Sequence, residues 1–328
     1  MRYIRNLSTD VYYNMAFDEY ALEQLPLDEP LFYLWQNRPA VIIGLNQNTH
    51  AEVDTDYIQQ HGIVLARRIT GGGAVYHDLG NLNYTIVGRS ADVERDYPEY
   101  AGHMMKALQA LGVRAELSGR NDILVEGRKV SGYAKRVYKD RLMVHGTLMY
   151  DVDIERLTRA LTPPTEKLAA KGIASVRSRV ANLRDYLPHI SDIHTLKEEL
   201  ERYLSREYHD EEYLLTDAQR SCISAASQAK FATPDWIYGR SPDSAVTYAR
   251  RLPCGRVEVH LHIKKGHIAH CRISGDFIGN APIATIENKL VGCLYERTAI
   301  TQCLAASDIR HYMDNTPTDT FINLLFNT

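Results

Sequence analysis

The stretch RRITGGGAVYHDLGN, residues 67–81, decides the fold of this chain. Two arginines stand directly before three consecutive glycines, and a histidine–aspartate pair follows them. Glycines cost backbone entropy and bury no side chain, so a run of them indicates a close approach to the backbone or a sharp turn. Bare peptide N–H groups form an anion-binding concavity, and a guanidinium beside them can clamp a phosphate. The stretch therefore predicts a local anion site.

The two common nucleotide-binding glycine motifs do not fit this stretch. A Walker loop would end in Gly-Lys-Ser or Gly-Lys-Thr, but Ala74 and Val75 follow Gly73. A dinucleotide fingerprint would need a third glycine where Tyr76 stands. A plain structural turn between strands is the alternative for three bare glycines. The flanking Arg67-Arg68 pair and the HDLGN segment favour the anion site.

Composition indicates an ordinary globular protein of two unequal domains. The chain has 328 residues, 45% hydrophobic and 24% charged, with a formal net charge of −3. This balance gives no broad basic surface, so we expect no nucleic-acid partner. The start carries no apolar signal region and no run is long enough to span a bilayer, so we expect no membrane association. The five cysteines are odd in number and contain no CxxC pair, which fits a reduced compartment. We therefore expect a cytoplasmic protein.

Hydrophobic patterns predict strands mixed with flanking helices, which is typical of an α+β fold. We expect helices at 11–25, 98–112 and 191–208, buried strands at 30–36, 40–45, 62–70 and 82–88, an antiparallel meander over 122–153, and a surface loop at 162–172. The pattern changes near residues 240–250. We therefore divide the chain into a domain of residues 1–245 and a small α/β domain of residues 246–328, with a hairpin at 255–277 and a helix at 283–295.

Lys129 is the second chemical candidate, because it begins the second strand of the predicted hairpin 123–133. A lysine in a hairpin is usually solvated at the strand edge. This one lies among apolar and small residues, so it can instead project into a pocket as a point charge. Asn121 and Asp122 nearby are suited to Mg²⁺ or a ribose hydroxyl, although such a pair more often forms a turn.

Three further features have both a functional and a plain structural interpretation. His145 in an apolar strand is either a ligand-binding residue or a satisfied core histidine. The basic segment 168–183 is either a lid over an anion site or an ordinary loop. His260 and His262 alternate with apolar residues in the C-terminal hairpin. They are either part of a metal site or members of a solvated sheet face, and the alternation favours the solvated face.

Four segments resemble the lipoate–protein ligase family, in order and spacing, and a fifth resembles the accessory domain of its bacterial two-domain members. They are RRITGGGAVYHDLGN (67–81), GRNDILVEGRKVSGYAK (119–135), HGTLMYDVDIERL (145–157), LAAKGIASVRSRV (168–180) and GCLYERT (292–298). The resemblance covers essentially the whole chain. It implies the mixed-sheet α/β fold of the biotin and lipoate ligases, related to class II synthetase cores, with a small C-terminal α/β accessory domain.

The resemblance also implies an activity. The enzyme would use ATP and Mg²⁺ to convert lipoate to lipoyl-AMP and pyrophosphate. It would then transfer the lipoyl group to a lysine of an apo-lipoyl domain, in 2-oxoacid dehydrogenase E2 subunits or the glycine cleavage H protein. The biotin ligases' Gly-Arg-Gly-Arg-x-Gly-Arg block and an N-terminal DNA-binding helix pair are absent from the sequence, which argues against a biotinyl repressor.

Site residues follow from the same resemblance. Lys129 would be catalytic, touching both lipoate and phosphate, and residues 171–178 would be the adenylate-binding loop. Lipoate would contact Trp35, Arg68, Gly72 and Lys129, and Asp122 would be a Mg²⁺ ligand. ATP and lipoyl-AMP would be held by Arg68, Gly73, Ala74, Val75, Tyr76, His77, Asn81, Asn121, Asp122, Lys129, Ser131, Gly132, His145 and Lys171.

Two alternatives on the same fold stay open at this point. One is a transferase that moves an octanoyl or lipoyl group through a cysteine thioester without adenylation. The other is a non-catalytic lipoyl-binding homologue. The cysteines argue against the first, because none precedes Cys222 whereas the proposed substrate-contacting segments lie between Trp35 and Arg179. The intact Arg68 and Lys129 argue against the second.

Overall fold

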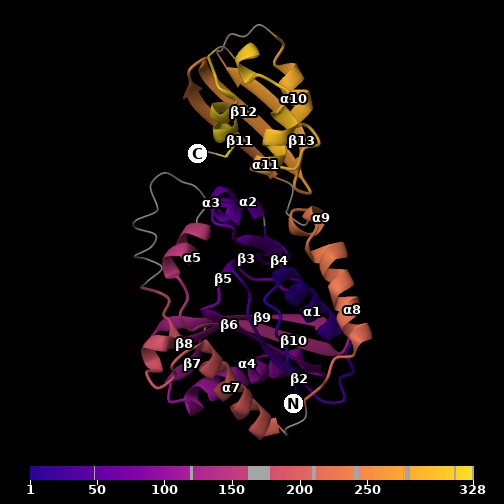
Figure 1. Ribbon diagram of the computed structural model, residues 1–328, viewed down its shortest axis with the longest axis vertical. Helices are drawn as coiled ribbons and strands as arrows, with labels where there is room; N and C mark the ends of the chain where they lie inside the picture. The colour runs from indigo at the N-terminus through magenta and orange to yellow at the C-terminus, as the bar shows by residue number, and fades with distance from the viewer. Residues whose placement is uncertain are drawn as a thin grey trace.

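The computed structural model describes residues 1–47, 49–118, 121–161, 178–208, 212–239, 244–275, 277, 281–313 and 315–326. It shows a large domain, with a small domain at one end (Figure 1). The predicted loop 162–172 and all but the last residue of the predicted adenylate-binding loop 171–178, Lys171 included, lie outside the described residues. Among the helices that the structure describes, none is both long and apolar enough to cross a membrane.

A mixed seven-stranded sheet forms the base of the large domain, with β1 and β2 parallel and the other neighbouring pairs antiparallel. Its strands, in spatial order, are β1 (Arg2–Tyr3), β2 (Leu31–Trp35), β6 (Asn81–Arg89), β10 (Arg141–Met149), β9 (Arg128–Tyr138), β8 (Asp122–Val125) and β7 (Ala115–Ser118). A second sheet has the order β4 (Val64–Arg67), β3 (Ala40–Ile43) and β5 (Val75–His77).

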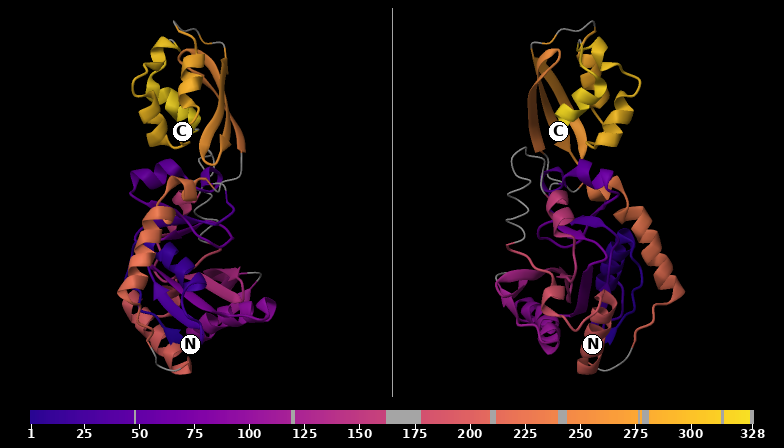
Figure 2. Two further views of the ribbon diagram at one scale, coloured as in Figure 1. Left: turned by 90° about the vertical axis from the view of Figure 1, so that its right-hand side faces the viewer. Right: turned by 60° about the vertical axis from the view of Figure 1, so that its left-hand side comes forward.

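Helices cover the two faces of the large sheet in separate layers (Figures 1 and 2). Helices α4 (Val93–Ala110) and α7 (Ile193–Tyr208) pack on one face, whereas α1 (Val11–Glu23) packs on the other, between the two sheets. The remaining helical segments of the large domain are α2 (Thr49–Glu52), α3 (Thr55–Gln60), α5 (Ile154–Ala160), η1 (Leu183–Tyr186), α8 (Asp217–Ala226), η2 (Ser227–Phe231) and α9 (Pro234–Ile237).

The strand β2 shows why the apolar runs in the sequence become strands. All five of its residues are buried, because the sheet is covered on both faces. Phe32 and Leu34 join the core beneath α4 and α7, while Leu31, Tyr33 and Trp35 join the core around α1. Successive strand residues point to opposite faces, so an uninterrupted apolar run fills both cores at once. The predicted buried strands are confirmed.

Turn residues set the hairpins where the sequence predicts them. Glu126 and Gly127 both have positive φ, 51° and 74°, and join β8 to β9. Lys265 and Gly266 do the same, at 51° and 78°, between the second and third strands of the small domain. Positive φ at both central residues matches the right-handed twist of a hairpin. Gly112, at φ 91°, ends the helix that precedes β7, also as predicted.

The helix predicted at 98–112 begins earlier, at Val93. Asp92 caps it, because its carboxylate accepts a hydrogen bond from the backbone N–H of Arg95 at 3.3 Å. Pro98 therefore lies inside the helix. A proline is most often found in the first turn of a helix, whereas Pro98 lies further along this one.

The small domain is a three-stranded antiparallel sheet with its helices on one face (Figure 2). Its elements are β11 (Ser244–Leu252), β12 (Gly255–Lys264), β13 (His267–Gly275), α10 (Ala284–Leu290), α11 (Arg297–Leu304), η3 (Ile309–His311) and α12 (Thr318–Leu325). The hairpin prediction missed β11, which begins at Ser244, two residues before the predicted start of the small domain at residue 246. The predicted helix 283–295 ends at Leu290, before Gly292 at φ 86°.

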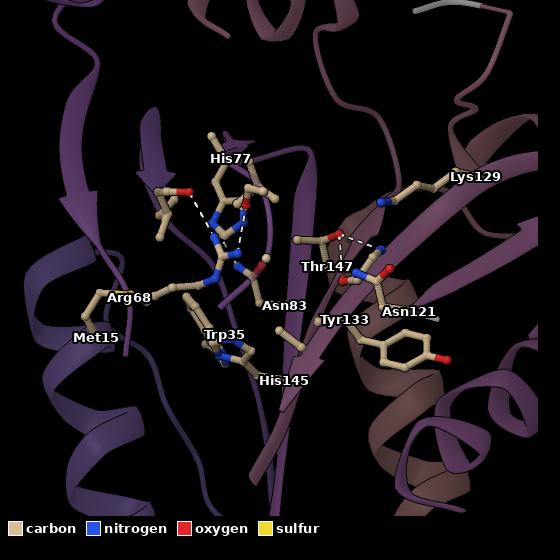
Figure 3. Close-up of a pocket in the computed structure, with 18 residues that line it drawn as sticks. Met15, Trp35, Arg68, His77, Asn83, Asn121, Lys129, Tyr133, His145 and Thr147 are labelled. Carbon is tan, nitrogen blue, oxygen red and sulfur yellow. Dashed lines mark hydrogen bonds between the residues drawn. The ribbon is translucent and has the colours of Figure 1, made fainter. Parts of the chain in front are cut away.

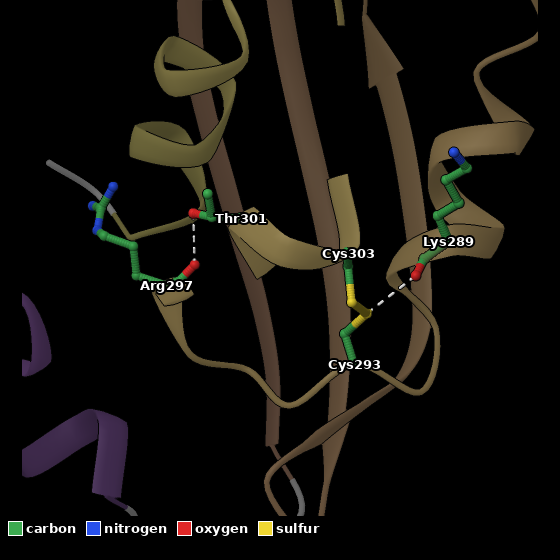
Figure 4. The surroundings of a disulfide bond; sticks show 5 residues. All are labelled: Lys289, Cys293, Arg297, Thr301 and Cys303. Atoms are coloured by element: carbon green, nitrogen blue, oxygen red, sulfur yellow. Dashed lines mark hydrogen bonds between the residues drawn. A yellow bond between two sulfur atoms is a disulfide. The ribbon is translucent and has the colours of Figure 1, made fainter. Parts of the chain in front are cut away.

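A disulfide joins Cys293 to Cys303, between the end of α10 and α11 (Figure 4). This pairing differs from the expectation that all five cysteines are reduced. Ten positions separate the two residues, and no short cysteine motif marks them. Cys222 is exposed, Cys254 is partly buried and Cys271 is buried, and each of the three is a free thiol. Burial raises the pKa of the Cys271 thiol to about 12, which makes it a poor nucleophile at neutral pH.

Candidate functional site

A cavity of about 600 Å³, counting the part open to solvent, lies between the two sheets of the large domain (Figure 3). Helix α1, strands of both sheets, the glycine loop and Asn121 contribute to its wall. The lining residues are Met15, Trp35, Ile42, Arg68, Gly72, Gly73, Ala74, Val75, His77, Asn83, Asn121, Lys129, Gly132, Tyr133, Ala134, His145, Gly146 and Thr147. Among these described residues there are two permanent cations and no carboxylate or thiol. The cavity therefore favours an anionic ligand, although the chain as a whole is acidic.

Arg68 holds the glycine loop from the inside. Its Nη2 donates to the carbonyls of Gly71 and Gly73, each at 2.7 Å, and its Nη1 donates to the carbonyl of Ile42 at 3.1 Å. Its Nε donates to Thr70 Oγ1 at 2.9 Å. A guanidinium has five N–H groups, so these four bonds leave at most one for a ligand. Burial lowers the pKa of Arg68 to about 10, and the side chain stays charged at neutral pH.

The hydrogen bonds from Arg68 set the direction of the peptide groups in the glycine loop. In a trans peptide the N–H points opposite to the C=O of the preceding residue. Because the carbonyls of Gly71 and Gly73 face Arg68, the N–H groups of Gly72 and Ala74 face away from it. Arg68 therefore fixes a loop in which the carbonyls of Gly71 and Gly73 point toward the guanidinium and the N–H groups of Gly72 and Ala74 point away from it.

The glycines satisfy both requirements that the sequence suggested. Gly72 adopts φ 92°, a conformation that side chains rarely allow, so the loop turns there. The loop is also approached closely by the segment after β3. A Cβ atom on Gly44 would lie 2.1 Å from the Gly72 carbonyl oxygen, a separation that real atoms do not tolerate.

Arg67, the last residue of β4, has a different role from Arg68, because successive side chains of an extended backbone point to opposite sides. It is fully buried. Its Nη1 donates to the carbonyls of Gly44, Leu45 and Gln47 at 2.8–3.0 Å, and its Nε and Nη2 both donate to the carbonyl of Ile237. Arg67 therefore ties β4 to the segment after β3 and to the end of α9, away from the cavity.

His145 lies at the floor of the cavity and is 6% exposed. Its Nδ1 is 2.7 Å from the carboxylate of Asp18 on α1, and its Nε2 is 2.8 Å from Thr70 Oγ1. The Asp18 carboxylate also accepts hydrogen bonds from Tyr33 at 2.6 Å and from Thr85 at 3.0 Å. A buried polar network thus runs from Asp18 on α1 through His145 and Thr70 to Arg68. His145 is both a hydrogen-bonded core histidine and a wall of the cavity.

His77 lines the same cavity and is 3% exposed. Burial, together with the charge of Arg68 and the proximity of His145, lowers the pKa of His77 to about 3. The imidazole is therefore neutral in any physiological buffer. Its Nδ1 faces the side-chain amide nitrogen of Asn37 at 3.0 Å, whereas its Nε2 is buried without a hydrogen-bond partner among the described residues.

Lys129 projects into the cavity from the start of β9 (Figure 3). The register between β8 and β9 shifts at this point, so that Val130 is an extra residue and Lys129 is re-aimed. The side chain lies over Gly132, where a Cβ atom would come within 2.7 Å of Nζ. Nζ forms an ion pair with Asp122 at 2.7 Å, and both side chains are about one-third exposed. The lysine is therefore paired rather than free at the strand edge.

Most of the predicted site residues meet at this cavity. Eleven line it: Trp35, Arg68, Gly72, Gly73, Ala74, Val75, His77, Asn121, Lys129, Gly132 and His145. Four others do not line it: Tyr76, Asn81, Asp122 and Ser131. Tyr76 alternates to the opposite face of β5 and packs in a neighbouring core. Asn81 donates to Asn83 at 2.9 Å, so it supports a residue that does line the wall.

Sequence reasoning missed seven lining residues: Met15, Ile42, Asn83, Tyr133, Ala134, Gly146 and Thr147. Strand alternation was the available signal for two of them. Thr147 shares a face with His145 two residues earlier, and its cross-strand partner on β6 is Asn83. Gly146 accommodates an aromatic ring, because a Cβ atom there would lie 2.6 Å from the ring of Tyr84.

The described residues include no group of three or more histidine, cysteine, aspartate or glutamate side chains placed to hold a metal ion. The C-terminal histidines agree with the solvated-face interpretation, since His260 and His262 are exposed while Val259 and Leu261 are buried. Asp122 is the single carboxylate beside Lys129 that was predicted as a Mg²⁺ ligand. Magnesium is commonly bound by one or two carboxylates together with substrate phosphates. The Asp122 carboxylate therefore fits a site in which a bound phosphate supplies the other ligands.

Comparison with known proteins places these features in a family. The lipoyl protein ligase A/B catalytic domain matches residues 10–205, and the bacterial lipoate protein ligase C-terminus matches residues 241–325. The chain is 40% identical to lipoate-protein ligase LplJ of Bacillus subtilis (strain 168) over 321 residues. That alignment covers 95% of this chain and 96% of LplJ.

Solved structures show the same fold in the large domain. A bi-partite lipoate protein ligase from Thermoplasma acidophilum, studied with its E2 lipoyl domain, has a TM-score of 0.68 and 30% identity, covering 75% of this chain and 98% of that one. A lipoate-protein ligase A bound with ATP has a TM-score of 0.63 and 28% identity, covering 72% of this chain and 97% of that one. The predicted mixed α/β ligase fold is confirmed.

Proposed function

This chain belongs to the lipoate–protein ligase family, and we propose that it activates lipoate with ATP and transfers the lipoyl group to a lysine of an apo-lipoyl domain. The observation that carries the proposal is the cavity between the two sheets. It brings together a glycine loop, a neutral buried histidine and Lys129, with cations and no carboxylate among its described lining residues.

In the first step a carboxylate oxygen of lipoate attacks the α-phosphorus of ATP, and pyrophosphate leaves. Two anions must approach each other, so the site has to supply positive charge and fixed donors. Lys129 supplies a mobile charge that can leave Asp122 for the reacting oxygens. The loop N–H groups, oriented by Arg68, supply donors that need no reorganisation.

In the second step the ε-amine of the acceptor lysine attacks the carbonyl carbon of lipoyl-AMP. An amide bond forms, the C–O bond of the mixed anhydride breaks, and AMP leaves. The apolar lipoyl tail needs an apolar wall, which Met15, Trp35 and Ile42 provide at the α1 end of the cavity. Mg²⁺, when bound, would neutralise phosphate charge. We infer that the Asp122 carboxylate would hold the ion together with oxygens of the nucleotide.

The partners and the site residues follow from this proposal. The ligase from Thermoplasma acidophilum was studied with an E2 lipoyl domain, and we propose such domains, with the glycine cleavage H protein, as acceptors here. We propose residues 1–245 as the catalytic domain and 246–328 as the accessory domain. We also keep the predicted lipoate and nucleotide contacts as proposals, with Lys171 included and Tyr76 left out because it packs in a neighbouring core. A cytoplasmic location is likewise kept as a proposal.

Intact mass spectrometry of an apo-lipoyl domain incubated with this protein, ATP, Mg²⁺ and lipoate tests the function. We expect one lipoyl group to be added per domain, with release of AMP. Omission of ATP should abolish the addition. Acylation that proceeds without ATP from an acylated carrier protein would instead support the thioester transferase. The absence of any modification with lipoate or octanoate would support the non-catalytic homologue.

A further inference from the structure

Three buried asparagines form a row that leads to His77 from the N-terminal segment. Asn6 is 5% exposed, Asn14 is 1% exposed and Asn37 is fully buried. Buried amides are kept where every donor and acceptor finds a partner. None of the three lines the cavity, yet the last one contacts a residue that does.

Backbone groups fix the orientation of the first two amides in the row, and the second fixes the third. The N–H of Ser8 donates to Asn6 Oδ1 at 3.0 Å, so Asn6 presents its nitrogen to Asn14 Oδ1 at 2.9 Å. Asn14 Nδ2 lies 2.9 Å from the carbonyl of Gln36 and 2.8 Å from Asn37 Oδ1. A carbonyl can only accept, so flipping Asn14 would bring two acceptors together.

This order determines the tautomer of His77. Asn37 Oδ1 accepts from Asn14, and its Nδ2 therefore faces His77 Nδ1 at 3.0 Å. An amide nitrogen can only donate, so Nδ1 must accept and carries no proton. Asn83 Nδ2 faces the same ring nitrogen at 3.5 Å, which agrees with this assignment. In a neutral ring the single proton is then on Nε2.

The Nε2–H group is a buried donor without a partner among the described residues, on a side chain that lines the cavity. A donor held in this way can be satisfied by an oxygen and not by another N–H group. The nearby guanidinium of Arg68 disfavours a cationic ligand and favours an anionic or strongly polarised oxygen.

We propose that Asn37 is a positioning residue that holds His77 as an Nε2–H donor, and that His77 donates this hydrogen bond to a carboxylate or phosphate oxygen of the acyl adenylate. The identity of the oxygen rests on the proposed function, whereas the tautomer does not. His77 acts as a fixed dipole and transfers no proton. Burial, with the charge of Arg68 and the proximity of His145, lowers its pKa to about 3, so the ring stays neutral between pH 5.5 and 8.

The tautomer can be measured in the free protein. Selective ¹⁵N-histidine labelling, with the His77→Gln variant used to assign the signals, should show an unprotonated Nδ1 and a protonated Nε2. Both signals should keep their positions from pH 5.5 to 8. A protonated Nδ1, or a titration within this range, would overturn the proposal. This measurement stands even if the protein proves inactive with lipoate, so the two failures can be distinguished.

The Asn37→Asp variant tests the link between the asparagine and the histidine. A carboxylate can only accept, so it should draw the proton to His77 Nδ1, which the same labelling would show. Adenylate formation should fall by about tenfold or more, mainly in kcat, because the preorganised donor is lost. Asn182→Asp is the matched control, since Asn182 bonds the backbone of Val152 away from the cavity. It should leave the His77 signals and the rate unchanged.

A comparison of the His77→Gln and His77→Met variants tests whether His77 acts as a hydrogen-bond donor. Glutamine keeps an N–H group at nearly the reach of Nε2, whereas methionine offers none. His77→Gln should therefore retain at least about tenfold more adenylate formation than His77→Met. Equal rates in the two variants, both folded by circular dichroism, would show that the hydrogen bond is not used.

Discussion

The Asp18 carboxylate on α1 lies 2.7 Å from Nδ1 of His145 on β10, although 127 positions separate the two residues in sequence. The contact links the helix between the sheets to the floor of the cavity. Thr70 continues the link to Arg68, which holds the glycine loop. The loop is thus supported by a buried polar network and not only by its own turns.

Asp18→Asn should disturb this support. The carboxylate accepts three hydrogen bonds, and an amide in its place turns one donor toward another donor. We expect a loss of about 1–3 kcal/mol in the free energy of unfolding and slower adenylate formation. Urea unfolding and AMP release measure the two effects. Tyr33→Phe is the control, because it removes one donor but leaves the His145 contact, and it should affect stability alone. Equal rates in both variants would refute the link to the loop.

Lys129→Ala should leave the protein folded and reduce adenylate formation about 10²–10³-fold, since the positive charge that stabilises the reacting oxygens is lost. Pyrophosphate release with saturating lipoate and ATP is the measurement. Lys135→Ala provides the control on the same strand, because Lys135 pairs with Glu94 outside the cavity. A Lys129→Ala rate within tenfold of the wild type would remove the lysine from the mechanism.

Replacement of all five cysteines by serine or alanine should leave lipoylation largely intact, provided that the variant folds. No described residue lining the cavity is a cysteine, and the one disulfide lies in the small domain. Intact mass of the acceptor domain checks the outcome. An acyl-enzyme that forms without ATP in the wild type, and is cleaved by hydroxylamine, would instead require a cysteine nucleophile.

Acid should destabilise the protein partly through His77. Burial lowers its pKa to about 3, against 6.5 for an ordinary histidine. Between these values the unfolded chain binds a proton that the folded protein does not, so stability falls as the pH falls from 6.5 toward 3. The contribution of one group is at most about 1.4 kcal/mol per pH unit. Urea unfolding at pH 7 and pH 5 should show a larger loss for the wild type than for His77→Gln. An identical loss would contradict the assignment.

The two domains are joined by a bidentate ion pair between Asp56 on α3 and Arg297 on α11, at 2.5 and 2.7 Å. Arg297→Gln should loosen this junction and increase hydrogen exchange in α3. Arg310→Gln is the matched control, since Arg310 forms a similar pair with Asp308 within the small domain. If hydrogen exchange in α3 were unchanged in Arg297→Gln, other contacts would have to hold the two domains together.

Local chemistry made much of this structure predictable. The Glu126-Gly127 and Lys265-Gly266 turns occur where the sequence predicts them, because positive φ has strong residue preferences. The apolar runs form buried strands because a sheet covered on both faces buries every residue of a strand. Lys129 and the glycine loop stand out because small neighbours beside a cation are unusual in an ordinary strand or turn.

Other features depend on contacts that no local pattern records. Asp18 and Asn37 look like ordinary polar residues in a helix and after a strand, and only the fold brings them to His145 and His77. Strand β11 was missed because it begins where the sequence pattern changes between the two predicted domains. Tyr76 was assigned to the site because a motif gives sequence neighbours but not the face of the strand on which each one lies.

Arg67 has a consequence for how this chain can change in evolution. The acceptors it uses at Leu45, Gln47 and Ile237 are all main-chain carbonyls, which every amino acid carries. Substitutions at those three positions leave the acceptors in place, whereas substitution of the arginine removes every one of these bonds together. A saturation mutagenesis scan should therefore tolerate fewer substitutions at the buried Arg67 than at Gln47, whose main-chain acceptor remains whatever side chain the position carries.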